Sequence, residues 1–317
     1  MTDDARAPET VVDVGIPTYG QPAFLAQSIE CVLAQSMPSW RLTISENGPG
    51  SDYVRRVVEP YLSDERVRYV ATGSNLGGAG NSTSLLRGAR AAYIALLHDD
   101  DLWAPDFLER RIAFLEGNPS CGLVFSCCDF IDDHGAVVHR FAPRLREGIQ
   151  PRRAFLRTLY RRNVICIPTV LVARWCYEEV GTAFDATVLF YDYEMWIRIA
   201  GRFDVGFLNV FDASYRIHRA QTTHAVDRHF GEHRLALLDA VDPTLPKDFP
   251  PLDRRRARSG ALLRIAVEEL ERGDRHAFFA RFRGAARVYP VGLFDPKLAS
   301  LVIGSMRRRA LQRRLWG

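Results

Sequence analysis

The run His98-Asp99-Asp100-Asp101 places an imidazole and three adjacent carboxylates directly after the apolar segment Tyr93–Leu97. Neighbouring carboxylates repel one another unless a positive charge neutralises them. Mg²⁺ and Mn²⁺ prefer oxygen ligands and keep open positions that phosphate oxygens can fill. The alternative is a polar turn that caps a helix starting at Pro105, since aspartate is a good N-cap residue. Because the cluster ends an apolar strand, the sequence favours a metal site that binds a diphosphate.

Three more polar segments in the first half of the chain follow short apolar runs. They are Pro17-Thr18-Tyr19, Glu46-Asn47, and the glycine-rich loop Gly73–Asn81, which contains Asn75, Gly78 and Asn81. The Tyr19 ring could stack on a nucleobase, and loop glycines let backbone N–H groups approach a phosphate or a ribose. The alternatives are a tyrosine packed on the sheet and an ordinary glycine turn.

Alternating strand and helix patterns account for the first 130 residues. Apolar runs at Val11–Ile16, Val67–Val70, Tyr93–Leu97 and Leu123–Cys127 are typical of buried strands, and segments with helical spacing separate them. Repeated strand–helix units imply an α/β fold with a mainly parallel sheet and helices on both faces. Such sheets bind ligands beyond the carboxyl ends of their strands. The polar segments should therefore converge on one rim of the sheet.

The organisation is predicted to change near residue 242. Residues 243–251 are rich in proline, which suits a linker. Beyond them, apolar residues recur at helical spacing as far as Met306. We therefore expect a catalytic domain over residues 1–242 and a C-terminal helical extension over residues 243–317.

Composition narrows the classes of function. The 317 residues carry a net charge of +4, and 25% of them are charged, which is ordinary for a globular protein and does not argue for nucleic acid. Residues 1–9 lack the apolar core of a signal peptide, and no stretch approaches about 18 uncharged apolar residues. The six cysteines form no Cys-x-x-Cys pair, which favours reduced, buried thiols. These features predict a cytoplasmic protein.

Four short motifs stand out between Val11 and Thr223. They are Val-Asp-Val-Gly-Ile-Pro-Thr-Tyr at 12–19, Leu-Leu-His-Asp-Asp-Asp-Leu-Trp-Ala-Pro-Asp at 96–106, Phe-Tyr-Asp-Tyr-Glu-Met-Trp-Ile-Arg at 190–198, and Tyr-Arg-Ile-His at 215–218. In this order they resemble the opening strand, the metal motif, the base segment and a late histidine motif of family 2 glycosyltransferases. The resemblance implies the GT-A fold, a Mn²⁺ or Mg²⁺ cofactor and a nucleotide-sugar donor.

The metal motif departs from the family pattern Asp-x-Asp-Asp. Counting back from Trp103 and Pro105 places His98 at the first aspartate and Asp100 at the metal-binding one. If Asp-x-Asp is instead matched literally, Asp99 and Asp101 are the two aspartates of the motif. We favour Asp100 as the metal ligand, and both registers stay open.

The resemblance also implies roles for other residues. Asp192 matches the catalytic base, although Tyr191 replaces the glutamate that usually precedes it. Glu46 matches an acidic position that binds the nucleobase, and His218 a histidine that returns to the metal. The expected donor contacts are Pro17, Thr18, Tyr19, Glu46, Asn75, Gly78, Asn81, His98 and Asp99. The expected metal ligands are Asp100, Asp101 and His218.

The predicted function is inverting transfer of a sugar from a UDP- or dTDP-type donor to a hydroxyl on a glycan, a lipid-linked molecule or a small molecule. One alternative is a nucleotidyltransferase that makes sugar nucleotides. That class usually has Arg and Lys in an early glycine-rich loop, whereas Thr18-Tyr19-Gly20-Gln21 has neither. The other alternative is a non-enzymatic module that binds nucleic acid through its basic helices. Mixed charges at Glu268–Arg272 favour a solvated helix face instead.

The last residues suggest contact with a membrane. Five arginines between Arg307 and Arg314 follow an apolar stripe at Leu298–Met306 and precede Trp316. Such a helix suits the surface of an anionic bilayer, so the enzyme could be peripheral at the inner face of the cell membrane. The alternative is a stripe packed on the catalytic domain. Membrane contact predicts sedimentation with anionic liposomes that added salt weakens.

Overall fold

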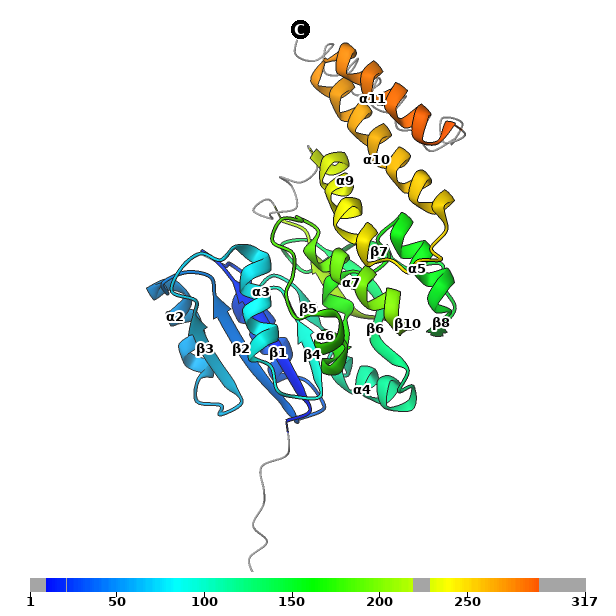
Figure 1. Cartoon of the computed structure of the whole chain (residues 1–317). Helices are drawn as coiled ribbons and strands as arrows, with labels where there is room; N and C mark the ends of the chain where they lie inside the picture. The colour runs from blue at the N-terminus through cyan, green and yellow to red at the C-terminus, as the bar shows by residue number, and fades with distance from the viewer. Residues whose placement is uncertain (1–9, 21, 219–228, 291–317) are drawn as a thin grey trace, which may run out of the picture. The chain divides into compact units, whose positions relative to one another are not determined.

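The computed structural model describes residues 10–20, 22–218 and 229–290 (Figure 1). The chain forms two compact units. One holds the residues up to 158, 163–187 and 191–218, and the other holds residues 159–162, 188–190 and those after 218. All of the predicted site residues fall in the first unit. The expected domain boundary at residue 242 stays a prediction.

The first unit is built on a single twisted sheet. Its strands are β1 (Val12–Thr18), β2 (Trp40–Glu46), β3 (Val67–Ala71), β4 (Tyr93–Leu96), β5 (Leu102–Trp103), β6 (Cys121–Ile131), β7 (Val137–Phe141), β8 (Gly148–Gln150), β9 (Leu171–Ala173) and β10 (Asp204–Arg216). The spatial order is β3-β2-β1-β4-β9-β6-β10-β5, with β7 on β6 and β8 on β10. Strands β3, β2, β1 and β4 run parallel, as do β6 and β10. The short β9 lies antiparallel between β4 and β6.

Helices connect the strands. They are α1 (Leu25–Leu33), α2 (Asp52–Val58), α3 (Gly77–Gly88), α4 (Phe107–Gly117), α5 (Arg152–Arg161), α6 (Arg174–Val180) and α7 (Tyr191–Arg202), with 3₁₀ turns η1 (Glu59–Tyr61) and η2 (Ile167–Thr169). Alternate residues of β1, namely Val12, Val14 and Ile16, are buried in one core with apolar residues of α1, α2 and α4. The opposite face packs on α3. Helices therefore cover both faces, and the predicted α/β fold is confirmed (Figure 1).

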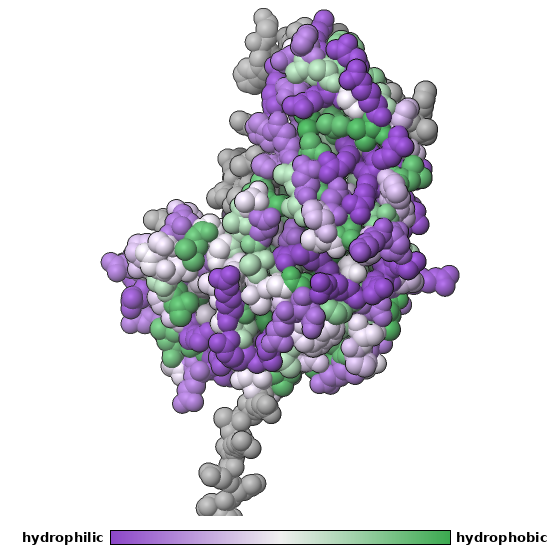
Figure 2. Space-filling model, viewed as in Figure 1, coloured by the Kyte–Doolittle hydropathy of each residue, from purple (hydrophilic) through white to green (hydrophobic). Residues whose placement is uncertain are grey.

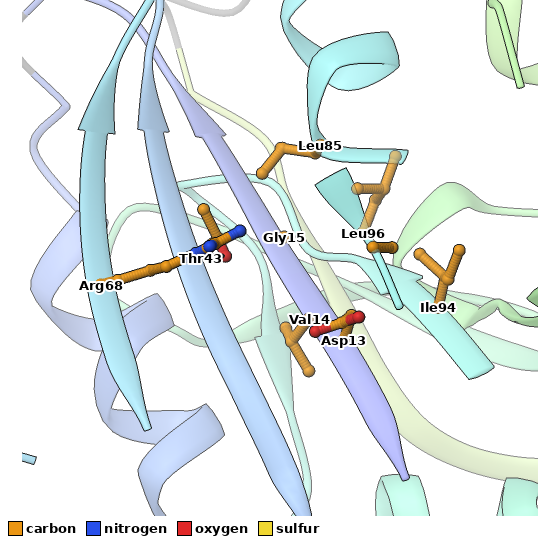
Figure 3. Close-up of a pocket in the computed structure, with 9 residues that line it drawn as sticks. Asp13, Val14, Gly15, Thr43, Arg68, Leu85, Ile94 and Leu96 are labelled. Carbon is orange, nitrogen blue, oxygen red and sulfur yellow. Dashed lines mark hydrogen bonds between the residues drawn. The ribbon is translucent and has the colours of Figure 1, made fainter. Parts of the chain in front are cut away.

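Gly15 sets how closely α3 approaches β1. A Cβ atom at this position would lie 2.9 Å from Leu96 and 3.0 Å from Leu85 of α3, closer than side chains normally pack. A small cavity remains between α3 and the sheet, lined by these residues and by Asp13, Thr43 and Arg68 (Figure 3). It lies near the start of β1, away from the end of that strand at Thr18. We therefore regard it as a packing defect.

A buried ion pair fixes the segment after the aspartate cluster. The Arg111 guanidinium of α4 donates to both carboxylate oxygens of Asp212 in β10, at 2.7 and 2.9 Å. The Asp212 backbone oxygen accepts the Ala104 N–H at 2.9 Å. Removing one partner of a buried pair leaves an uncompensated charge, so such pairs tolerate little change. The contact holds the chain that follows residue 101 against β10.

The second unit contains the helices α9 (Phe230–Val241), η4 (Asp242–Thr244), α10 (Pro251–Arg272) and α11 (Arg275–Val288). Gly273 ends α10 in the left-handed conformation, and Asp274 caps α11 by accepting the Ala277 N–H at 2.8 Å. Leu263 of α10 and Ala285 of α11 are buried against each other. The predicted helical extension is thus confirmed as far as residue 290.

The apolar stripe and arginine cluster predicted at Leu298–Trp316 lie outside the described residues. Among the helices that the structure describes, none is both long and apolar enough to cross a bilayer. In Figure 2 the visible surface is largely hydrophilic, with apolar residues scattered in small groups.

Candidate active site

The carboxyl ends of adjacent strands bring the first polar segments together. Thr18 and Glu46 are paired in register at the ends of β1 and β2. The chain leaves β4 through Leu97, whose N–H donates to the Gly15 carbonyl at 3.0 Å. The Thr18 hydroxyl then donates to the Asp99 carboxylate at 2.5 Å. The opening strand and the aspartate cluster therefore meet at one rim.

The glycine-rich loop is held against the end of β2. The Asn47 amide oxygen accepts the Leu76 N–H at 2.7 Å, and its NH₂ group donates to the Asn75 side chain at 3.0 Å. The Asn75 oxygen also accepts the Gly77 N–H at 2.8 Å. Gly77 has a φ of +71°, which favours glycine. The loop is thus a defined turn that begins α3 beside the rim.

Two predicted donor contacts are buried beneath the surface of the rim. Glu46 accepts hydrogen bonds from the Tyr69 hydroxyl and, at 3.1 Å, from the Ser51 N–H. The Asn81 amide bonds both the hydroxyl and the carbonyl of Ser45, at 2.5 and 2.8 Å. Both side chains are almost fully enclosed, so they brace the site from below.

The remaining predicted donor contacts are more accessible. The Tyr19 side chain is 65% exposed, which leaves its ring free to meet a planar ligand. Asn75 and Gly78 are exposed as well, and Pro17 is half-buried. The donor-binding roles of these residues, and of Glu46 and Asn81, stay predictions.

The aspartates of the cluster differ in environment. Burial raises the pKa of Asp99 to about 6, and the neighbouring charge of Asp100 adds to the rise. Burial also raises the pKa of Asp101 well above its usual range, again with a contribution from Asp100. Asp100 itself is only half-buried. Crowded carboxylates of this kind are stabilised by a nearby cation.

Asp101 is fully buried, and only one of its two carboxylate oxygens accepts a hydrogen bond from a described residue. Its Oδ1 accepts the Arg216 N–H at 3.0 Å, whereas its Oδ2 has no hydrogen-bond partner among the described residues. The His98 Nδ1 lies 4.0 Å from Oδ2. A buried carboxylate oxygen without a partner is unusual, and a water molecule or an ion could satisfy it.

Arg216, which the sequence did not single out, organises the cluster. Its Nε donates to the Asp100 carbonyl at 2.9 Å, and its NH2 group donates to the Gln27 side chain at 2.8 Å. The guanidinium also lies 4.1 Å above the Phe24 ring. It is the second residue of the motif Tyr-Arg-Ile-His, but its contacts reach residues more than 100 positions away. Spacing alone could not reveal them.

His218 reaches the cluster from the end of β10. Its Nε2 lies 3.0 Å from the Asp100 Oδ2. Ligand atoms of His98, Asp100 and Asp101 all lie within 4.8 Å of one another. Carboxylate and imidazole donors, with one buried oxygen unpartnered, fit a divalent cation. The arrangement brings the predicted ligands Asp100, Asp101 and His218 together with His98.

The predicted base belongs to the first turn of α7. Burial raises the pKa of Asp192, and the nearby charge of His98 acts in the opposite direction. The preceding Tyr191 faces the glycine loop, since a Cβ atom on Gly78 would lie 3.2 Å from its hydroxyl. Burial raises the pKa of Tyr191 to about 12, so its hydroxyl stays protonated. Tyr191 therefore links helix α7 to the start of α3. The sequence could not indicate this contact, because the two segments are far apart in the chain.

Several known proteins are similar to this chain in sequence. The family model for glycosyl transferase family 2 matches residues 13–172, half of the chain, including the aspartate cluster. An uncharacterized glycosyltransferase of Methanocaldococcus jannaschii is 26% identical over 211 residues, which cover 65% of this chain and 71% of the relative. The Escherichia coli protein WfgD, a UDP-Glc:alpha-D-GlcNAc-diphosphoundecaprenol beta-1,3-glucosyltransferase, is 24% identical over 60% of this chain and 69% of its own. Two further relatives, at 35% and 29% identity, match over only 14% and 52% of their lengths.

The fold is also that of a solved transferase. The mannosyltransferase PcManGT of Pyrobaculum calidifontis, solved with GDP-Man and Mn²⁺, aligns with 98% of this chain and 89% of its own at a TM-score of 0.59 and 16% identity. The family match lies on the strands and loops that build the rim, and the likeness extends over nearly the whole chain. This chain therefore belongs to glycosyl transferase family 2, and it is a glycosyltransferase with the GT-A fold.

Proposed function

We propose that this glycosyltransferase moves a sugar from a nucleoside-diphosphate sugar to a hydroxyl acceptor, with inversion and with a divalent cation. The observation that carries the proposal is the contact of Asp100 with His218, 3.0 Å apart, beside the unpartnered Oδ2 of Asp101. Asp192 lies in the first turn of α7, next to Tyr191, whose hydroxyl would lie 3.2 Å from a Cβ atom on Gly78 of the rim loop.

The metal would be held by Asp100 and His218, with the buried carboxyl group of Asp101 beside them. When bound, such a cation neutralises the charge that develops on the leaving diphosphate. Thr18 fixes the orientation of Asp99 next to it, at 2.5 Å. The loop that begins α3 offers backbone N–H groups to the phosphates or the ribose.

Asp192 would take the proton of the attacking hydroxyl. Burial raises its pKa, which makes it a stronger base than an ordinary aspartate. Glycosyl transfer passes through an oxocarbenium-like transition state, and one base opposite the leaving group leads to direct displacement. Inversion at the anomeric carbon follows from that arrangement.

The chemical class of the donor and acceptor is supported by the relatives. WfgD acts with UDP-Glc on a diphosphoundecaprenol-linked sugar, and PcManGT binds GDP-Man with Mn²⁺. We infer a UDP- or dTDP-type donor here, and an acceptor hydroxyl on a glycan, glycolipid or polysaccharide precursor. Peripheral membrane contact through residues 298–316 is proposed as the means of reaching a lipid-linked acceptor.

Donor binding is tested by thermal denaturation with a panel of UDP, dTDP and GDP in Mn²⁺. A ligand at about 100 times its Kd stabilises the native state by about 2.7 kcal/mol, which raises Tm by several degrees. We expect UDP or dTDP with Mn²⁺ to raise Tm, and the rise to disappear in EDTA. A panel in which no nucleotide shifts Tm would contradict the proposed donor site.

A further inference from the structure

The metal motif of this chain begins with a histidine. His98 follows Leu97, which is fully buried and hydrogen-bonded to Gly15 in β1, so its backbone is anchored to the sheet. Its side chain is 29% exposed and lies at the rim. A ligand nitrogen of His98 is within 4.8 Å of ligand atoms of both Asp100 and Asp101. His98 is therefore close enough to share a cation with them after small side-chain rotations.

A second observation points to a cation at the same place. The Asp101 side chain has 0% exposure, and its Oδ2 has no hydrogen-bond partner among the described residues. That oxygen lies 4.0 Å from the His98 Nδ1, too far for a hydrogen bond. An unsatisfied buried carboxylate oxygen is costly, and a cation between the side chains would remove the penalty.

Two imidazoles thus approach Asp100. His218 contacts its Oδ2 at 3.0 Å, and His98 approaches it from the end of β4. Mg²⁺ prefers carboxylate, carbonyl and water oxygens, whereas imidazole nitrogen binds first-row transition ions better. A site with two imidazoles should therefore discriminate against Mg²⁺ more than a site built from carboxylates.

We propose that His98 is a direct ligand of the metal, beside Asp100 and His218, and that it makes the site selective for transition ions such as Mn²⁺ over Mg²⁺. The inference rests on the metal site of the proposed function and adds a ligand and a metal preference to it. His98→Asp replaces the imidazole by a carboxylate at the same position. That substitution should make the site more like an all-oxygen site.

The first test counts imidazole nitrogens on bound Mn²⁺ by pulsed electron paramagnetic resonance of the full-length protein. We expect couplings from two imidazoles in the wild type, from one in His98→Asp and from one in His218→Ala. His134→Asp makes the same chemical change at an exposed turn, and this variant should keep the couplings from both imidazoles. One imidazole in the wild type, unchanged by His98→Asp, would overturn the proposal.

The second test measures metal affinity by competition between Mn²⁺ and Mg²⁺ without any donor. Mutating a group that only orients a ligand typically lowers metal affinity by about 10- to 100-fold, and replacing a ligand itself should cost at least as much. The Mn²⁺-to-Mg²⁺ affinity ratio should therefore fall about tenfold or more in His98→Asp and stay unchanged in His134→Asp. An equal ratio in wild type and His98→Asp would exclude His98 as a ligand while leaving the proposed function intact. A wild-type protein that binds neither ion would contradict the metal site itself.

Discussion

Asp192→Asn is expected to lower the turnover number by about 100- to 10,000-fold, the usual contribution of a positioned base. The amide has nearly the same shape as the carboxylate but cannot accept the proton of the acceptor hydroxyl. The donor should bind with unchanged affinity, because the role proposed for Asp192 is to accept a proton from the acceptor and not to bind the diphosphate. Initial rates at saturating donor, together with a donor binding isotherm, separate the two effects.

The pH dependence gives an independent check on this base. Burial raises the pKa of Asp192, so the carboxylate becomes protonated at a higher pH than a solvated aspartate. The rate should therefore fall on the acidic side at a pH above the usual aspartate range, and that limb should vanish in Asp192→Asn.

Asp133→Asn makes the same chemical change on an exposed carboxylate and should leave the rate and its pH profile intact. A near-wild-type rate in Asp192→Asn would mean that another group is the base. Retained anomeric configuration in the product, measured by NMR, would contradict direct displacement.

Asp100→Asn is expected to lower turnover by at least about 100-fold, since a metal contributes several kcal/mol to stabilising the developing charge. The carboxamide lacks the negative charge that would attract the cation, and His218 loses the carboxylate that lies 3.0 Å from its Nε2. EDTA should have the same effect on the wild type, and added Mn²⁺ should restore the rate. Steady-state kinetics across a Mn²⁺ titration measure both responses.

The matched control is again Asp133→Asn, which should respond to Mn²⁺ as the wild type does. Circular dichroism should show that Asp100→Asn remains folded, because its side chain is only half-buried. Full wild-type activity in EDTA would exclude a metal-dependent reaction. Wild-type activity in Asp100→Asn with a normal Mn²⁺ response would favour the other register of the motif.

The fold was predictable wherever local sequence determines it. Apolar runs with helical segments between them predicted the parallel strands β1, β3 and β4, and the GT-A fold is confirmed. The contact of Thr18 with Asp99 follows from the same rule, because parallel strands end at one edge. By contrast, the placement of β9 between β4 and β6 joins segments far apart in the sequence, and three residues carry too little periodicity to reveal it.

The site was predictable in its residue types and less so in its contacts. The order of the motifs predicted Asp100 and His218 as ligands of the same metal ion, and their side chains lie 3.0 Å apart. The spacing to Trp103 and Pro105 favoured Asp100 as the metal ligand, but it did not reveal that Asp101 is buried and accepts the Arg216 N–H whereas Asp100 is more accessible. That distinction depends on Arg216, whose partners come from three other segments of the chain. Burial and long-range hydrogen bonds are set by the whole fold and are absent from any short window.

The most direct test is the release of free nucleoside diphosphate from a panel of UDP-, dTDP- and GDP-sugars by the full-length protein with Mn²⁺. Sugar transfer predicts release from at least one UDP- or dTDP-sugar, stimulation by a suitable acceptor, and loss of release in EDTA and in Asp100→Asn. A nucleotidyltransferase would instead release pyrophosphate from a nucleoside triphosphate and a sugar phosphate. Pyrophosphate release, with no nucleoside diphosphate formed from any sugar nucleotide, would contradict the account.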